Sequence, residues 1–156
     1  MKFKHTSVLL HETIDNLKPK NGGLYVDATF GGGGHAKYLL SKIDTGTLVG
    51  FDQDEYAIKS AKLNFANLLQ LDSEPRLELV HDNFSNLEKD LVKLGYSDGI
   101  DGIYYDLGVS SPQFDQADRG FSYRYDARLD MRMDQSQDLD AYQLVNTCLL
   151  YTSDAA

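Results

Sequence analysis

The residues best suited to chemistry surround one glycine-rich segment, VDATFGGGGH, at positions 26–35. Four consecutive glycines follow a strand-like apolar run, and Asp27 precedes them. Such a turn between a strand and a helix lets the backbone approach a nucleotide-like ligand closely. The spacing from Gly31 through Gly33 to Ala36 fits a loose dinucleotide fingerprint, and Asp52 lies about 20 residues on, where a ribose-binding acid is expected. The segment therefore predicts a cofactor that contains a nucleoside.

Electric charge separates the candidate cofactors. A pyrophosphate would face the negative charge of Asp27 at the mouth of the loop, whereas S-adenosylmethionine carries a sulfonium and an ammonium group and no phosphate. The pattern thus favours S-adenosylmethionine, with glycines beside its amino-acid part, Asp52 accepting from the ribose hydroxyls and Phe84 against adenine. Phe84 would serve equally well as a core residue. An NAD-dependent Rossmann oxidoreductase stays the alternative, because the glycine spacing fits both cofactors.

A second segment, DLGVSSPQ at positions 106–113, points to the methyl acceptor. Asp106 stands before a loop of small residues that Pro112 restrains. Methyltransferases that act on exocyclic amines have a polar residue and a proline-containing loop here, where acceptor groups hold the NH2 and remove charge as nitrogen attacks. The segment predicts a base amine as acceptor and Asp106 as the candidate catalytic residue. An ordinary β-turn after a buried strand is the alternative.

The elements that would position these residues alternate between strand-like and helical runs, which is typical of an α/β domain with a parallel sheet. After the glycines, one helical face carries Ala36, Leu39, Leu40 and Ile43, and the next helix carries Ile58, Ala61, Phe65, Leu68 and Leu69. The strands are expected at residues 24–29, 47–52, 77–82 and 102–107.

The third helix has marked limits in the sequence. Ser85 followed by Glu88 is a capping-box pattern, and Gly95 is a stop signal.

Ligands of open parallel sheets bind beyond the carboxyl ends of the strands, so acidic residues there would line the site. Aspartates lie at or next to all four expected strand ends: Asp27, Asp52, Asp82 and Asp106.

Length and composition limit the possible classes of protein. A chain of 156 residues with 42% hydrophobic residues is long enough for one globular domain. The single cysteine, Cys148, excludes an intramolecular disulfide framework, and no apolar run approaches the ~20 residues that span a bilayer. With no signal-peptide pattern, we expect a cytoplasmic protein. The four histidines lack the clustered spacing of a metal site, so no metal is expected.

The net charge of -9 gives no overall attraction to nucleic acid, so an RNA partner would require a local basic patch or further sequence. The long stretch after residue 108 holds arginines without lysine, which could form an edge that contacts phosphate. Interleaved aspartates make internal ion pairs an equal alternative. The arginines are Arg119, Arg124, Arg128 and Arg132, and the aspartates are Asp118, Asp126, Asp130 and Asp134.

Five motifs together resemble, in order and spacing, the ribosomal RNA small subunit methyltransferase H (RsmH/MraW) family. They are KHTSVLL at 4–10, DATFGGGGH at 27–35, DLGVSSPQ at 106–113, RGFS at 119–122 and LDMRMD at 129–134. The resemblance covers residues 4–146 and implies a Rossmann-like class I methyltransferase. It also implies that S-adenosylmethionine is used to methylate N4 of cytidine 1402 in 16S rRNA of the small ribosomal subunit. By position, it implies cofactor contacts from Gly33, Gly34, His35, Asp52, Phe84, Asp106 and Gln113.

The chain departs from this family in two respects. Residues 125–128 replace a turn containing Gly-Pro, and family members are about twice as long, with a helical insertion after the fourth strand. We therefore expect an incomplete sheet of four βα units in the order 4-1-2-3. Residues 1–107 would form a partial cofactor-binding domain, 108–146 the acceptor loop and the start of the insertion, and 147–156 a non-native tail. Such a fragment would bind cofactor at most and would not catalyse the reaction.

Overall fold

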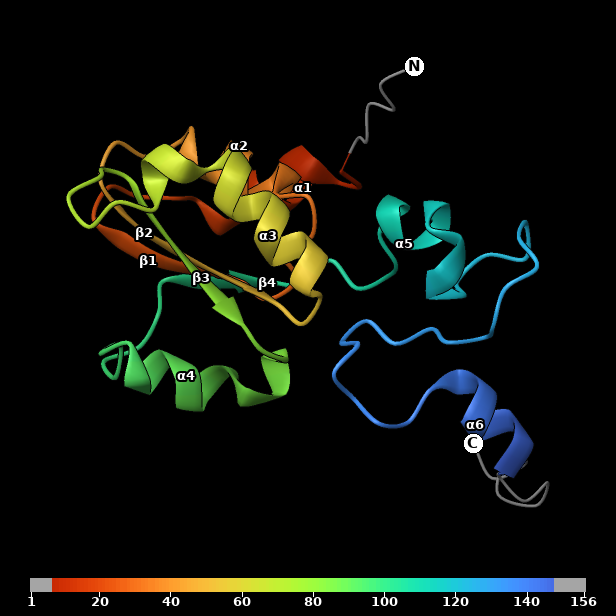
Figure 1. Cartoon of the computed structure of the whole chain (residues 1–156). Helices are drawn as coiled ribbons and strands as arrows, with labels where there is room; N and C mark the ends of the chain where they lie inside the picture. The colour runs from red at the N-terminus through yellow and green to blue at the C-terminus, as the bar shows by residue number, and fades with distance from the viewer. Residues whose placement is uncertain (1–6, 148–156) are drawn as a thin grey trace. The chain divides into compact units, whose positions relative to one another are not determined.

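The computed structural model of the chain describes residues 7–147 and contains two compact units, Met1–Gly108 and Val109–Ala156. The first unit is built on a parallel four-stranded sheet in the order β3-β2-β1-β4, which confirms the predicted order (Figure 1). Its strands are β1 (Gly23–Asp27), β2 (Gly46–Asp52), β3 (Arg76–His81) and β4 (Gly102–Tyr104). The last strand is shorter than predicted, because it ends at Tyr104 and not at Leu107.

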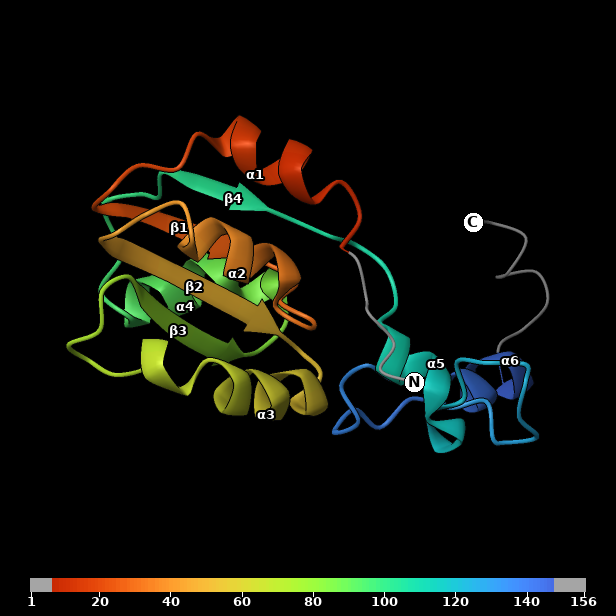
Figure 2. The ribbon, with the colours of Figure 1, turned by 90° about the horizontal axis from the view of Figure 1, so that it is seen from above.

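Helices cover both faces of this sheet (Figures 1 and 2). Three of them, α1 (Leu10–Leu17), α2 (Gly34–Leu40) and α3 (Glu55–Asn64), lie on one face, and α4 (Leu87–Lys93) lies on the other. Two 3-10 turns, Ala66–Leu68 and Phe84–Asn86, follow α3 and precede α4. The sequence did not predict α1. The first unit therefore has three layers, with the glycine loop between β1 and α2.

Side-chain alternation along the strands explains the two hydrophobic clusters. Tyr25, Leu48 and Leu77 point to the face of α1, α2 and α3, whereas Val26 and Val49 point to the face of α4. The apolar face predicted after the glycines is confirmed, since its four residues are all buried, three of them in α2 and the last just beyond its end: Ala36, Leu39, Leu40 and Ile43. The glycine loop thus emerges from a strand and a helix that are anchored in the core.

Two helix boundaries differ from the predictions. The apolar stripe after β2 continues past the end of α3, because the helix stops at Asn64 and the chain tightens into the turn Ala66–Leu68. The predicted cap by Ser85 and Glu88 is wrong, since the Asn83 side chain accepts from the Ser85 N–H at 2.9 Å. Asparagine is an equally strong cap, and here it starts the 3-10 turn before α4.

The predicted stop at Gly95 is confirmed and has a clear geometry. Gly95 adopts a φ of 90°, in the left-handed region that favours glycine. Its N–H donates to the Val92 carbonyl at 3.0 Å, and the Tyr96 N–H donates to the Leu91 carbonyl at 2.9 Å. These two bonds form a Schellman motif, which satisfies carbonyls that the end of a helix would leave unpaired.

The second unit contains short helices and irregular chain. Its described residues, 109–147, form α5 (Ser111–Asp115), the 3-10 turn Ala117–Arg119 and α6 (Ala141–Thr147), and none of them lies in a strand. Residues 148–156, which hold most of the predicted non-native tail, lie outside the described residues. No helix in residues 7–147 is long and apolar enough to cross a membrane. No group of three or more His, Cys, Asp or Glu side chains in the same range could hold a metal ion.

Candidate functional site

The glycine loop combines packed and open positions. Gly31 and Gly33 have φ angles of 52° and 74°, where other residues are strained. A side chain at Gly33 would also collide with the Phe65 ring, because its Cβ would lie 2.6 Å from a ring carbon. At Gly32, in contrast, a Cβ would meet no atom within 4 Å. The loop is therefore fixed at Gly33 by packing, while the backbone near Gly32 is open to a ligand.

Asp52, at the end of β2, holds this loop. Its Oδ2 accepts from the Gly31 N–H at 2.7 Å, and its Oδ1 accepts from the Asp54 N–H at 2.8 Å. Burial raises the pKa of Asp52, and the two backbone hydrogen bonds oppose this rise. A carboxylate oxygen accepts more than one hydrogen bond, so Asp52 keeps the capacity to bind a further hydroxyl.

Asp27 does not face a ligand, and the predicted position at the mouth of the loop is wrong. The residue is 1% exposed. Its Oδ2 accepts from the Tyr104 hydroxyl at 2.8 Å, and its Oδ1 accepts from the Thr29 N–H at 3.1 Å. Burial raises the pKa of Asp27 to about 7, against the lowering effect of these hydrogen bonds. Asp27 is thus a structural acid below the loop, and its charge cannot select between cofactors.

Asp106 lies beyond the end of β4 and has an exposed side chain. Its Oδ2 is 3.7 Å from Nδ1 of His35, a residue that is itself buried. The Nε2 atom of His35 lies 3.1 Å from the Val8 carbonyl oxygen. The His35 ring therefore lies between Val8, in the segment before α1, and Asp106. It is the second residue of α2, directly after the last glycine.

Phe84 belongs to neither hydrophobic cluster and is 38% exposed. Its ring meets that of Tyr105 edge to face, with 5.6 Å between the centroids. Next to it, the Asn83 amide donates to Oε1 of Gln53 at 2.8 Å and so links the ends of β2 and β3. The alternative that Phe84 is a core residue is therefore wrong, and an aromatic surface is available beside the strand ends.

The fourth predicted acid, Asp82, has local partners. Its Oδ1 accepts from the Asn86 amide at 2.9 Å and from the Asn83 N–H at 2.6 Å. These two hydrogen bonds, that of Asn86 first, lower the pKa of Asp82. Asp82 thus organises the turn before α4, which is the ordinary role of an aspartate in a turn.

Gln113 belongs to the second unit, whereas the other predicted cofactor residues belong to the first. Its side chain is buried, and its Oε1 accepts from the Ser110 N–H at 2.9 Å. Together with Ser110 it forms the capping box of α5. In this structure Gln113 has a local structural role.

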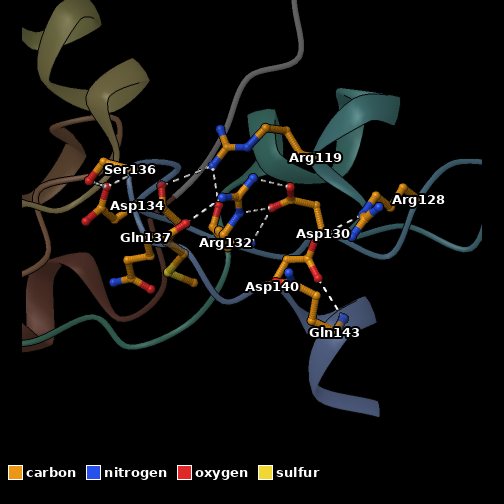
Figure 3. Close-up of polar contacts among 10 residues, drawn as sticks. Arg119, Arg128, Asp130, Arg132, Asp134, Ser136, Gln137, Asp140 and Gln143 are labelled. Atoms are coloured by element: carbon orange, nitrogen blue, oxygen red, sulfur yellow. Dashed lines mark hydrogen bonds and ion pairs between the residues drawn. The ribbon is translucent and has the colours of Figure 1, made fainter. Parts of the chain in front are cut away.

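The second unit also shows how its arginines are used (Figure 3). Arg132 donates from Nε and Nη2 to the two oxygens of Asp130, at 2.9 and 2.7 Å. Arg128 pairs with Asp140 at 2.8 Å and lies over the ring of Tyr142. Internal ion pairs are thus found for these two arginines. Asp130 belongs to the predicted interleaved series of aspartates, whereas Asp140 does not.

The other two arginines of the series differ from each other. Arg119 is 2% exposed and donates to the carbonyls of Arg132 and Met133, at 3.1 and 3.2 Å (Figure 3). Arg124 is exposed, beside a Tyr123 side chain that is 100% exposed. Only Arg124 therefore keeps the properties of a residue that could contact phosphate freely.

Two residues of the site, Thr29 and Tyr104, were not predicted from the sequence. The Thr29 Oγ1 accepts from the Asp106 N–H at 2.7 Å, and Tyr104 donates to Asp27. Tyr104 reaches Asp27 because the register of β4 against β1 places the two residues opposite each other, and no sequence pattern gives that register. The role of Thr29 depends on how the chain leaves the sheet, and no sequence pattern encodes that path.

The parallel sheet, its helices on both faces and the glycine loop after β1 define a Rossmann-like α/β protein. The sequence model of the MraW methylase family matches residues 2–152, and the chain belongs to this family. This confirms the resemblance that the five motifs indicated.

The curated relatives carry the name ribosomal RNA small subunit methyltransferase H. That of Lactobacillus helveticus is 95% identical over 147 residues, which are 94% of this chain and 47% of the relative. That of Lactobacillus acidophilus is 91% identical over the same shares, and that of Oenococcus oeni is 57% identical over 145 residues, 93% of this chain and 45% of the relative. The chain thus spans about half the length of the curated relatives it matches.

Proposed function

We propose that the chain carries the methyl-donor site of an S-adenosylmethionine-dependent methyltransferase that modifies N4 of cytidine 1402 in 16S rRNA. The membership of the MraW methylase family and the names of the relatives support this proposal. The observation that carries it is the hydrogen bond between Asp52 and the backbone of Gly31. This bond brings together the Asp52 carboxylate at the end of β2 and the glycine loop, whose backbone is open near Gly32.

The residues present fit S-adenosylmethionine. Gly33, Gly34 and His35 would lie beside its amino-acid part, Asp52 would accept from the ribose hydroxyls, and the exposed ring of Phe84 would lie against adenine. When bound, the cofactor supplies an electrophilic methyl group on its sulfonium. Gln113 stays a further proposed contact, in addition to its role in the cap of α5.

Asp106 is the proposed residue for the methyl acceptor. Its carboxylate is exposed at the start of the loop that leads to Pro112, and its Oδ2 lies 3.7 Å from Nδ1 of His35. A carboxylate here would accept a hydrogen bond from the exocyclic NH2 and offset the positive charge that develops on nitrogen. We assign cofactor binding to residues 1–107, with Asp106 at their end facing the acceptor, and we assign the acceptor loop and the start of the helical insertion to residues 108–146.

Calorimetric titration of the chain tests the cofactor. We expect binding of S-adenosylmethionine and S-adenosylhomocysteine and no binding of NAD, which separates the proposal from a nicotinamide-dependent oxidoreductase. Asp52→Ala should weaken methyl-donor binding by about 1–3 kcal/mol, because it removes a charged acceptor from the ribose hydroxyls. Asp72→Ala, at an exposed aspartate, is the matched control. An unchanged affinity in Asp52→Ala would remove the ribose role.

The substrate requires a separate experiment. The Lactobacillus helveticus relative would be incubated with 30S subunits and isotope-labelled methyl donor, and the rRNA digested and analysed by mass spectrometry. We expect one labelled N4-methylcytidine at position 1402. A label on another nucleotide, or no label, would contradict the proposed substrate without affecting the cofactor result.

A further inference from the structure

The main-chain pairing between β1 and β4 stops where the glycine loop and the acceptor loop begin. The last register pair of β1 and β4 is Asp27 with Tyr104. One more backbone bond follows, from the Ala28 N–H to the Tyr104 carbonyl at 3.1 Å. Beyond it, residues 28–34 form the glycine loop, and residues 105–110 lead to the acceptor loop. Asp106 is therefore outside the sheet, where the ladder no longer fixes its position.

A side chain continues the connection. The Asp106 N–H donates to Oγ1 of Thr29 at 2.7 Å, in place of a main-chain carbonyl. Thr29 is itself held from below, because its own N–H donates to Oδ1 of Asp27 at 3.1 Å. The other oxygen of Asp27 accepts from the Tyr104 hydroxyl at 2.8 Å, which closes a ring between the two strand ends. We call these four residues, Asp27, Thr29, Tyr104 and Asp106, the strand-end ring.

We propose that Thr29 is a positioning residue that fixes the backbone of Asp106, and with it the start of the acceptor loop, against the glycine loop. The inference rests on the proposed function, in which Asp106 faces the acceptor amine. Asp106 is exposed, and its Oδ2 lies 3.7 Å from Nδ1 of His35, which is longer than a hydrogen bond. Its orientation therefore depends mainly on the backbone bond to Thr29.

The type of residue at position 29 suits this task. A β-branched side chain has few χ1 rotamers, so its hydroxyl occupies a defined place. Beneath it, Asp27 and Tyr104 are buried, at 1% and 5% exposure, where water competes little for their hydrogen bonds. The buried part of the strand-end ring, Asp27 and Tyr104, is thus rigid. The hydroxyl of Thr29 connects this rigid part to the backbone of the exposed Asp106.

The first test measures the anchor itself in the 156-residue chain. Amide hydrogen exchange at Asp106 would be followed by NMR in wild type, Thr29→Val, Thr29→Ser and the control Thr45→Val, at an exposed threonine outside the ring. Valine keeps the shape of threonine and lacks the acceptor. We expect exchange at Asp106 to be about tenfold faster in Thr29→Val, the effect of one net hydrogen bond. Thr29→Ser and Thr45→Val should match wild type. An unchanged rate in Thr29→Val overturns the inference.

The second test uses the same substitutions at the aligned positions of the Lactobacillus helveticus relative. The valine variant should lower kcat on 30S subunits by about 10- to 100-fold, because the carboxylate that corresponds to Asp106 is misplaced. Its Kd for S-adenosylhomocysteine should stay at the wild-type value, and the serine variant should restore kcat. A wild-type kcat in the valine variant, or an equal loss in the serine variant, would contradict the positioning role. Inactive wild-type protein would contradict the proposed function instead, while the exchange rates still decide the anchor.

Discussion

The two units of the chain are held together by different forces. In the described residues, every buried hydrophobic side chain lies in the first unit, and all but Ala28 and Ile58 belong to the two clusters on the faces of the sheet. The buried side chains of the second unit are all polar or charged: Gln113, Arg119, Asp130 and Asp140. Apolar burial tolerates small displacements, whereas a buried polar network is stable only when each member keeps its partners.

The candidate cofactor site therefore belongs to the unit with a hydrophobic core, whereas the second unit is held by polar contacts. The candidate cofactor site lies at the ends of β1 and β2, whose central residues are buried, so its geometry is defined by a packed core. The second unit exposes many large apolar side chains, such as Tyr123, Leu139 and Val145. Its conformation therefore depends on ion pairs and caps, each of which contributes modestly.

The largest effect is expected from the core of the first unit. Leu39 in α2 is fully buried, and Leu39→Ala should lower the free energy of unfolding by about 2–5 kcal/mol, through lost burial and the cavity that remains. Urea denaturation followed by far-UV circular dichroism measures this change. Leu63→Ala is the control, since Leu63 in α3 is 82% exposed and should change stability little. Equal losses in the two variants would show that α2 is not anchored in the core.

The pH dependence of stability should have opposite signs in the two units. In the first, burial raises the pKa of Asp27 from 3.8 to about 7. A group whose pKa is higher in the folded state stabilises at low pH, and this stabilisation is lost as pH rises through the folded value. The first unit should therefore lose a few kcal/mol between pH 4 and pH 8, at about 1.4 kcal/mol for each pKa unit. Asp27→Asn should remove most of this slope and leave the part that comes from Asp52, whose pKa burial also raises, whereas Asp72→Asn should keep the whole slope. The midpoints of urea denaturation, measured between pH 4 and pH 8 for wild type and both variants, test this prediction.

In the second unit, the hydrogen bonds from Arg132 lower the pKa of Asp130. A lowered pKa stabilises the folded state above the unfolded value, and this contribution disappears as pH falls below about 4. Asp130→Asn should therefore loosen the segment at neutral pH by about 1–3 kcal/mol, because Arg132 loses its charged acceptor. Hydrogen exchange at Met131 and Ala141 would report this opening. Asp118→Asn, at an exposed aspartate, is the control, and equal protection in the two variants would contradict a structural role of the ion pair.

The same contrast explains which features the sequence could predict. The strands, the order of the sheet and the apolar face of α2 follow from hydrophobic periodicity, and the first unit is held by hydrophobic burial. Caps were less predictable. The pattern at Ser85 and Glu88 did not form a capping box, because Asn83 is an equally good cap two residues earlier.

Polar partners were the least predictable feature. Asp27 looked like an exposed acid at a loop mouth, yet it is turned inward to Tyr104, a residue 77 positions away in the chain. Nor does the sequence show that Asp140 is the partner of Arg128, since several aspartates lie closer to that arginine. Which acid pairs with which base depends on the path of the chain between them, and periodicity does not describe that path.

The smallest effect is expected from the ion pair between Arg128 and Asp140, because the Asp140 carboxylate also takes part in a helix cap. Its Oδ1 accepts from the Gln143 N–H at 2.7 Å, and Oε1 of Gln143 accepts from the Asp140 N–H at 3.0 Å, so the pair forms a capping box for α6 (Figure 3). Its Oδ2 accepts from Arg128, whose guanidinium lies 4.6 Å from the centroid of the Tyr142 ring. The lost pair with Arg128 should cost about 1 kcal/mol or less, because the side chain of Arg128 is 56% exposed to solvent that screens its charge.

Arg128→Gln tests whether the ion pair or the cap holds α6. The variant removes the charge and leaves the capping box in place, so exchange at Leu144 should accelerate only slightly, about two- to fivefold. High salt should produce a similar small acceleration in wild type and none in the variant, since salt screens only a pair that is present. Asp140→Ala removes both interactions and should accelerate exchange more than Arg128→Gln does. If Arg128→Gln opened α6 as far as Asp140→Ala, the ion pair would hold the helix by itself, and the capping box would contribute nothing.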